Sequence, residues 1–198
     1  MAAAKQQLRL WIRNVRDSIP DDVARAATAA ARRRVLAYPL VRSAEMVAMY
    51  SALARELGTA ELADVMWGRG QVLAYPRVSR GKDRLTFHRV ESRAELSPGT
   101  LGILEPSPDA PVVPIERIDL FIVPGLAFDR EGGRLGWGKG YYDAALAHNS
   151  RAPRIGYGFE CQLVDEVPRS EWDAPLTHVV TEVGVRVCRH HRTPRSGA

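Results

Sequence analysis

The sequence predicts an α/β fold of three layers, in which a mostly parallel sheet is covered by helices on both faces. Apolar runs of strand length alternate along the chain with segments whose apolar residues recur at helical spacing. The run at residues 118–123 has the strongest strand character, and a glycine-rich loop and a helical segment follow it. Because ligands bind at the carboxyl ends of strands in such sheets, the loops that follow strands are candidate sites.

The chain begins with two predicted helices. In residues 2–17 apolar side chains recur at helical spacing, at Leu8, Trp11, Ile12 and Val15. Basic side chains follow one flank of this helix at offsets of four, four and three, at Lys5, Arg9, Arg13 and Arg16. By itself such a flank indicates a solvated helix face. Ser18 is predicted to cap an alanine-rich second helix, which runs to about Leu36 and ends before Pro39.

The remaining elements are mainly strands. Strand character is found at residues 44–50, 71–75, 85–90, 154–159 and 177–187. A helix capped by Thr59 follows the first of these, and another runs from about 140 to 148. We expect Pro76 to stop the strand before it, and residues 85–90 to lie on an edge. Residues 97–114 hold five prolines and predict a surface connection, where a functional loop is expected.

Length and composition favour one domain over residues 1–188, with a disordered tail at 189–198. No apolar run has membrane-spanning length, and the first residues lack the pattern of a secretory signal. The two cysteines, Cys161 and Cys188, are far apart and form no metal-binding pattern. We therefore expect a reduced, cytoplasmic protein without structural zinc and without a membrane partner. A monomer is the default expectation.

The net charge of +5 raises the question of a nucleic-acid partner. The basic residues are spread over helices, with one cluster at residues 32–34, and no helix–turn–helix or aromatic-basic motif accompanies them. A small polyanionic ligand would use the same positive charge. We expect small-molecule substrates and no nucleic acid.

The segment 123–142 carries the most specific chemistry of the chain. Its glycines let the backbone approach a ligand closely, and exposed N–H groups before a helix start suit a phosphate. Arg134 and Lys139 add positive charge, and Asp143 supplies a hard oxygen of the kind Mg²⁺ prefers. The sequence therefore predicts a site for a nucleotide phosphate with Mg²⁺.

The spacing differs from the two common phosphate-binding patterns. GxxxxGK[ST] is absent, because Gly140 follows Lys139. Gly136 and Gly138 alternate with Gly140 and do not reproduce GxGxxG. For the glycines alone, a glycine-rich hairpin between two elements remains the alternative.

The run VPGLAFDREGGRLGWGKGYYD resembles the hallmark of the 5-formyltetrahydrofolate cyclo-ligase family. Further matches, in order along nearly the whole chain, are Lys5 to Arg9, Tyr50 with Glu56 to Thr59, Tyr75-Pro76-Arg77, Glu105-Pro106, Trp172-Asp173 and residues 179–182. The resemblance implies a Rossmann-like three-layer fold. It also implies a reaction in which ATP phosphorylates the formyl oxygen of 5-formyltetrahydrofolate and the neighbouring amine nitrogen attacks the activated carbon. The products would be 5,10-methenyltetrahydrofolate, ADP and phosphate, with Mg²⁺ required.

The resemblance also implies roles for individual residues. Lys139 and Arg134 are the main catalytic cations. ATP would be bound by Lys5, Arg9, Arg134, Leu135, Gly136, Trp137, Gly138, Lys139, Gly140, Tyr141 and Tyr142. The folate would be bound by Tyr50, Ser51 and Glu56 together with Trp137, Gly138, Lys139, Gly140 and Tyr141. Asp143 would ligate Mg²⁺.

Some points stay open at the level of sequence. Where some family members carry a second metal-binding Asp, this chain has Thr177-His178, and Asp173 or water could compensate. A polyglutamate tail could be bound by Arg77, Arg80 or the cluster 32–34, and nothing selects among them. The rivals to the cyclo-ligase are an ATP-binding protein of the same fold with another substrate and a basic nucleic-acid-binding module without catalysis.

Overall fold

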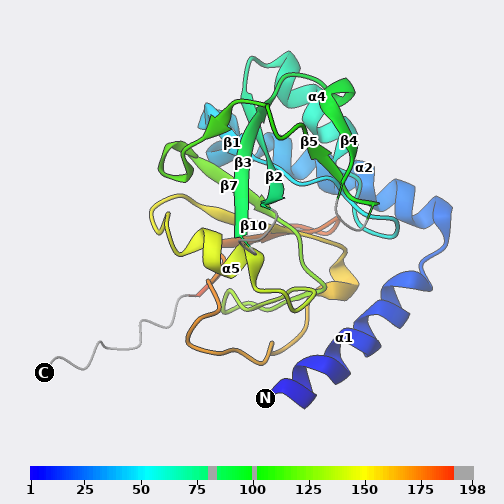
Figure 1. The fold of residues 1–198 in the computed structure, drawn as a ribbon. Helices are drawn as coiled ribbons and strands as arrows, with labels where there is room; N and C mark the ends of the chain where they lie inside the picture. Colours follow the sequence, from blue (N-terminus) through cyan, green and yellow to red (C-terminus); the bar gives the residue numbers. More distant parts are fainter. Residues whose placement is uncertain (80–83, 100–101, 190–198) are drawn as a thin grey trace, which may run out of the picture.

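The structure is a computed structural model that describes residues 1–79, 84–99 and 102–189. Arg80 and the predicted disordered tail beyond Arg189 lie outside the described residues. The centre of the fold is an eight-stranded sheet (Figure 1), with the strand order β12-β11-β10-β7-β1-β2-β3-β6. These strands are β1 (Met46–Ala48), β2 (Val72–Ser79), β3 (Arg84–Val90), β6 (Val112–Val113), β7 (Leu120–Val123), β10 (Arg154–Tyr157), β11 (His178–Val180) and β12 (Val185–Val187).

The inner strands are parallel and the outer pairs are antiparallel. The parallel part runs from β11 through β10, β7 and β1 to β2, while β12, β3 and β6 add antiparallel pairs. Parallel strands must be covered on both faces, and this sheet meets that requirement. The predicted mostly parallel α/β fold is confirmed.

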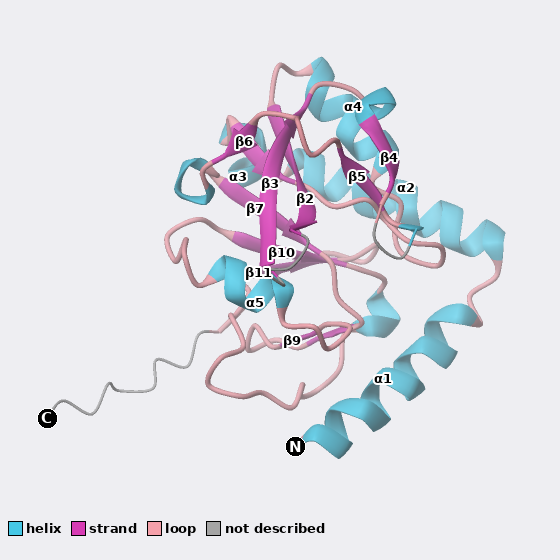
Figure 2. Cartoon of the chain, viewed as in Figure 1, coloured by secondary structure: helices cyan, strands magenta, loops and turns pink. Residues whose placement is uncertain are grey.

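Helices cover both faces of the sheet (Figure 2). Successive side chains of a strand point to opposite faces, so each strand packs against both helix layers. In β7, Leu120 and Ile122 pack into one core cluster, while Phe121 and Val123 pack into the other. The first cluster includes residues of α2 (Asp21–Ala37), α3 (Pro39–Ser43) and α4 (Ala60–Gly68). The second includes residues of α5 (Tyr141–Leu146). The sheet is therefore the middle of three layers.

The first helix, α1 (Ala2–Asp17), is set apart from the layer of α2 and α4. Its Ile12 is buried in a third cluster with Leu126, Leu135 and Val167. Two of these belong to the segment that contains the small sheet of β8 (Ala127–Phe128) and β9 (Arg134–Leu135). The helix is thus anchored on the glycine-rich segment, although Trp11, which the pattern assigned to its apolar face, is 53% exposed.

Several local predictions need correction. The strand β2 continues through Pro76, because β1 pairs only with residues 72–74 and leaves Pro76 without a partner on that side. The predicted surface connection at 97–114 contains part of a hairpin, β4 (Leu96–Pro98) with β5 (Leu104–Pro106), and also the short strand β6. Because β6 pairs with β3, residues 85–90 are not the outermost strand. Single-turn helices complete the described elements at Arg93–Glu95, Ile115–Arg117 and Glu160–Gln162.

The predicted helix caps are also different in the structure. Ser18 ends α1, where its hydroxyl donates to the Val15 carbonyl, and Pro20 precedes α2. Thr59 stands at the start of α4, but its hydroxyl donates to the Tyr50 carbonyl and accepts from the Ala52 N–H. This side chain stabilises the loop after β1 instead of the helix. Among the described residues, no helix is both long and apolar enough to cross a bilayer.

Three glycines make room for one aromatic ring beside the sheet. A Cβ added to Gly125, Gly156 or Gly158 would approach the Phe128 ring to 2.6–2.8 Å, which is too close for any real contact. Phe128 is fully buried, so its ring has no free space to enter.

We predict that Gly156→Ala lowers the free energy of unfolding by roughly 1–3 kcal/mol, because the new methyl group overpacks the core against Phe128 and Leu176. Gly184→Ala is the matched control, since a Cβ there meets nothing within 4 Å. Urea unfolding of both variants measures the difference. Equal stabilities of the two variants would contradict this packing argument.

Candidate active site

The glycine-rich segment after β7 is shaped by one buried carboxylate. Asp129 is fully buried, and its Oδ1 accepts hydrogen bonds from the backbone N–H groups of Glu131 (2.9 Å) and Gly133 (2.6 Å). Its Oδ2 accepts from the Val167 N–H (2.9 Å). Gly132 sits in this turn at φ +86°, where a Cβ would lie 2.5 Å from the Leu176 carbonyl oxygen. The turn is therefore fixed before the chain reaches Arg134.

The predicted cation and the predicted metal ligand of this segment bind each other. Arg134 is buried, and its Nη2 donates to Asp143 Oδ1 at 2.7 Å. Its guanidinium also lies 5.6 Å from the centre of the Tyr142 ring. Asp143 accepts a second hydrogen bond from the Ala174 N–H at 3.2 Å. Arg134 and Asp143 thus neutralise each other and join α5 to the loop before β11.

The helix α1 brings the other predicted cations to the same place. Lys5 Nζ lies 2.5 Å from Asp173 Oδ2, one residue before the Ala174 that contacts Asp143. Arg9 Nε donates to the Gly136 carbonyl at 2.9 Å. Lys139, in contrast, is exposed between Gly138 and Gly140, both of which have left-handed φ values. Residues more than a hundred positions apart therefore form one cationic site.

The predicted folate-binding residues follow β1, the neighbour of β7. Glu56 is buried, and its Oε2 accepts from the Leu53 N–H at 2.9 Å. Burial raises the pKa of the Glu56 carboxyl, while the Leu53 N–H, Arg16 and a contact with the Trp137 side chain favour the ionised form. Trp137 belongs to the glycine-rich segment. The contact joins the two loops that were predicted to share one rim of the sheet.

Tyr50 and Ser51 also follow β1, but their hydroxyl groups contact backbone carbonyls of the fold. Tyr50 is buried in the core, and its hydroxyl is 3.4 Å from the Tyr157 carbonyl. Burial raises the pKa of Tyr50 well above its ordinary value, so this hydroxyl stays protonated. Ser51 Oγ donates to the Leu104 carbonyl at 2.7 Å. Both hydroxyl groups therefore already have partners within the fold.

Two arginines that contact predicted site residues, Arg13 and Arg16, were not predicted as site residues; the sequence pattern indicated only that they belong to a basic helix flank. The guanidinium of Arg13 lies 5.5 Å from the centre of the Trp137 ring. Arg16 is 4% exposed, and its Nη1 is 4.0 Å from Glu56 Oε1. The signal was the helical spacing that both share with Lys5 and Arg9, but spacing alone does not distinguish a site from a solvated face.

The possible metal ligands were tested against the geometry. Within the described ranges, no three His, Cys, Asp or Glu side chains gather in a group that could hold a metal ion. Thr177 Oγ1 accepts from the Arg154 N–H and donates to the Arg154 carbonyl, so it holds β10 to β11. His178 is buried beside it, with its ring 5.3 Å from that of Tyr38. The carboxylates of Asp143 and Asp173 remain the hard oxygen donors that suit Mg²⁺.

Comparison with known proteins agrees with this arrangement. Residues 1–182 match the 5-formyltetrahydrofolate cyclo-ligase family. The chain belongs to this family. It is 37% identical over 155 residues to the 5-formyltetrahydrofolate cyclo-ligase of Escherichia coli K12, which covers 76% of this chain and 85% of the relative. It is 35% identical over 187 residues to that of Mycolicibacterium smegmatis, covering 90% and 93% of the two chains.

Solved structures of similar proteins have the same fold. The solution structure of a 5,10-methenyltetrahydrofolate synthetase from Aquifex aeolicus superposes with a TM-score of 0.83 at 31% identity, covering 96% of this chain and 98% of the other. A methenyltetrahydrofolate synthetase from Mycoplasma pneumoniae, at 21% identity and a TM-score of 0.74, shares the fold. The resemblance found in the sequence to the cyclo-ligase family, a family of ligases, is confirmed.

The raised pKa of Glu56 leads to a prediction about stability. A carboxyl whose pKa is higher in the folded state destabilises the fold above that pKa, and the effect vanishes below the ordinary pKa of glutamate. We therefore predict that Glu56→Gln raises the free energy of unfolding at pH 7, and that the gain disappears as the pH falls towards 4. Denaturant unfolding across this pH range measures it. Glu116→Gln, at an exposed carboxylate, is the control, and a gain in this control of equal size would contradict the argument.

Proposed function

We propose that this chain converts 5-formyltetrahydrofolate to 5,10-methenyltetrahydrofolate in a reaction that requires ATP and Mg²⁺ and releases ADP and phosphate. The observation that carries the proposal is the contact between Glu56 and Trp137, because it joins a cationic glycine-rich loop to a buried carboxylate. The first suits the phosphates of a nucleotide, and the second suits the N–H donors of a pterin ring. Membership of the cyclo-ligase family supports the same assignment.

The reaction needs two steps, the first at the γ-phosphorus of ATP and the second at the formyl carbon. The formyl oxygen attacks the γ-phosphorus of ATP, so that an O–P bond forms and ADP leaves. The neighbouring amine nitrogen then attacks the formyl carbon and loses its proton, which the departing phosphate or solvent accepts. The C–O bond breaks, and phosphate departs with the former formyl oxygen. The protein contributes charge neutralisation and alignment, since no protein nucleophile is required.

The cations of the site divide this work. Lys139 is exposed between Gly138 and Gly140 and would contact the transferred phosphoryl group. Lys5 and Arg9 come from α1, beside the loop at Asp173 and Gly136, where they would hold the nucleotide phosphates. Arg134 is paired with Asp143, so it holds the loop to α5 and also adds positive charge to the site.

Magnesium would be held at the carboxylates of Asp143 and Asp173 and would supply neutralisation of the phosphate charge. In the structure these carboxylates contact Arg134 and Lys5. Nucleotide phosphates would compete for the same two cations, which would release carboxylate oxygens for the metal. We further propose that the protein acts in the cytoplasm as a monomer, without a nucleic-acid partner.

The first experiment is to mix the protein with 5-formyltetrahydrofolate and Mg²⁺, with and without ATP, and to follow the product by its near-ultraviolet absorbance. Product that appears only with ATP supports the proposal. Absence of product with intact ATP binding would overturn it, in favour of the same fold and nucleotide loop serving another acceptor.

We predict that Lys139→Ala lowers kcat/KM by roughly 100-fold, because it removes a preorganised cation from the transferred phosphoryl group. Arg151→Ala is the control, since this exposed cation lies before β10, at the opposite end of the parallel strands. Steady-state kinetics with varied ATP measures both variants. Wild-type kinetics for Lys139→Ala would remove this residue from the site.

We predict that Asp143→Asn raises the Mg²⁺ concentration needed for half-maximal activity, because the variant loses an anionic oxygen ligand. A Mg²⁺ titration at saturating ATP measures the shift, and thermal unfolding tests whether the Arg134 contact still holds the fold. An unchanged titration in a folded variant would contradict the metal assignment.

A further inference from the structure

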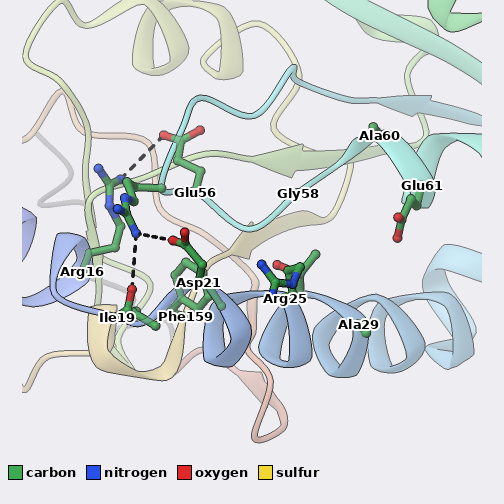
Figure 3. A pocket seen from close by; sticks show the side chains of 13 residues that line it. Arg16, Ile19, Asp21, Arg25, Ala29, Glu56, Gly58, Ala60, Glu61 and Phe159 are labelled. Atoms are coloured by element: carbon green, nitrogen blue, oxygen red, sulfur yellow. Dashed lines mark hydrogen bonds and ion pairs between the residues drawn. The ribbon is translucent and has the colours of Figure 1, made fainter.

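A cavity of about 570 Å³ opens on the side of Glu56 away from the glycine-rich loop. It lies between α2 and the loop from β1 to α4 (Figure 3). The residues that line it are Arg16, Ile19, Asp21, Ala24, Arg25, Thr28, Ala29, Arg55, Glu56, Gly58, Ala60, Glu61 and Phe159. No residue of the glycine-rich segment is among these, so the cavity is available for a part of a substrate other than the nucleotide.

One end of the cavity contains polar groups whose bonding is incomplete. Only 4% of Arg16 is exposed, and its Nη1 has no hydrogen-bond partner among the described residues. Glu56 Oε1 is 4.0 Å from this nitrogen, beyond hydrogen-bond length, while Arg16 Nε and Nη2 donate to Asp17 Oδ1 at 3.4 and 3.3 Å. A buried donor of this kind is costly unless a ligand or water completes its bonding. This end is therefore suited to a polar head group held between Glu56 and Arg16.

Part of the cavity wall is apolar. Figure 3 shows Phe159 and Ala29 along the wall formed with α2, with Gly58 and Ala60 on the opposite segment. Small side chains on both walls leave a space in which a flat ring can lie. Phe159 offers it an aromatic partner.

Besides Arg16, whose Nη1 is unpartnered, one further arginine that lines this cavity has no partner among the described residues. Arg55 donates to Asp21 Oδ1 at 2.8 Å and to the Ile19 carbonyl at 3.3 Å. Glu61 is paired with Arg32. Arg25 lies on α2, and Figure 3 shows it between Phe159 and Ala29. It makes no hydrogen bond or ion pair with the described residues. The Arg25 guanidinium can therefore bind an anionic group that enters the cavity.

We propose that this cavity binds the benzoylglutamate part of the folate, and that Arg25 pairs with a glutamate carboxylate. The proposal rests on the proposed function, which places the pterin ring at Glu56. A donor-rich ring at Glu56, an aromatic ring against Phe159 and an anion at Arg25 follow in the order in which the substrate carries these groups. The cavity therefore sets the preference for a substrate with a charged tail.

The other arginines considered for this tail are engaged elsewhere. Arg77 Nη1 donates to the Pro106 carbonyl at 2.5 Å and lies 3.5 Å from Glu105. Arg34 donates to the Ala30 carbonyl at 3.3 Å, and Arg32 is paired with Glu61. Arg33 is exposed on α2 but does not line the cavity. Arg33 therefore serves as a matched control on the same helix.

The test compares two ligands by direct binding. One is 5-formyltetrahydrofolate; the other is the same compound with methylamine in place of glutamate, which keeps both ring systems but has no carboxylate. Calorimetry gives Kd for wild type, Arg25→Ala and Arg33→Ala. We expect Arg25→Ala to raise Kd for 5-formyltetrahydrofolate by roughly threefold to tenfold, the usual size for one partly exposed charged contact, and to leave Kd for the neutral compound unchanged. Arg33→Ala should change neither value.

Three results would overturn the inference: an equal loss for both ligands, no loss for either, or the same loss with Arg33→Ala. Because the readout is binding, these outcomes are separate from the absence of turnover, which would overturn the proposed function alone. A wild-type protein that binds neither ligand would overturn both.

Discussion

The parallel pairing of β1 with β7 is the constraint on which the rest of the site depends. Val47 and Ala48 lie opposite Leu120 and Phe121, so the loops that follow these two strands leave the sheet at the same edge. One loop supplies Glu56 and the other supplies Trp137. A shift of one residue in this register would exchange the side chains that one strand presents to the two core clusters, so the packing that fixes the register also fixes how the two loops lie relative to each other.

The helix α1 then closes the site along a single flank. Lys5 contacts Asp173, Arg9 the Gly136 carbonyl, Arg13 the Trp137 ring and Arg16 the neighbourhood of Glu56. The helix is fixed to the glycine-rich segment by Ile12, which lies beside these basic residues on the same side of the helix. Four successive basic side chains therefore run from Asp173 and the glycine-rich loop to the Glu56 carboxylate. A rigid helix is well suited to this task, because its side chains repeat at fixed intervals.

The charges of the site are paired with partners that a ligand could replace. Arg134 with Asp143 and Lys5 with Asp173 satisfy one another at distances of 2.7 and 2.5 Å. Burial of an unpaired charge would be costly, so these pairs keep the site stable before any nucleotide arrives. Asp129 differs from these carboxylates, because three backbone N–H groups occupy it in the interior of the turn. It maintains the shape of the loop, whereas the other two carboxylates can exchange partners.

The residue pattern alone was enough to predict the layers of the fold and the cyclo-ligase family. Alternating apolar runs and helical periodicity are local properties, and the run from Val123 to Asp143 is specific enough to indicate both its chemistry and the cyclo-ligase family. The sequence could not decide that Pro76 lies inside a strand, since this depends on where β1 stops. Nor could it separate Arg16 from a solvated helix face, or select Arg25 from the other arginines. Those distinctions depend on which side chains lie in a cavity and which already have partners, and only the packing of distant segments in three dimensions sets either of them.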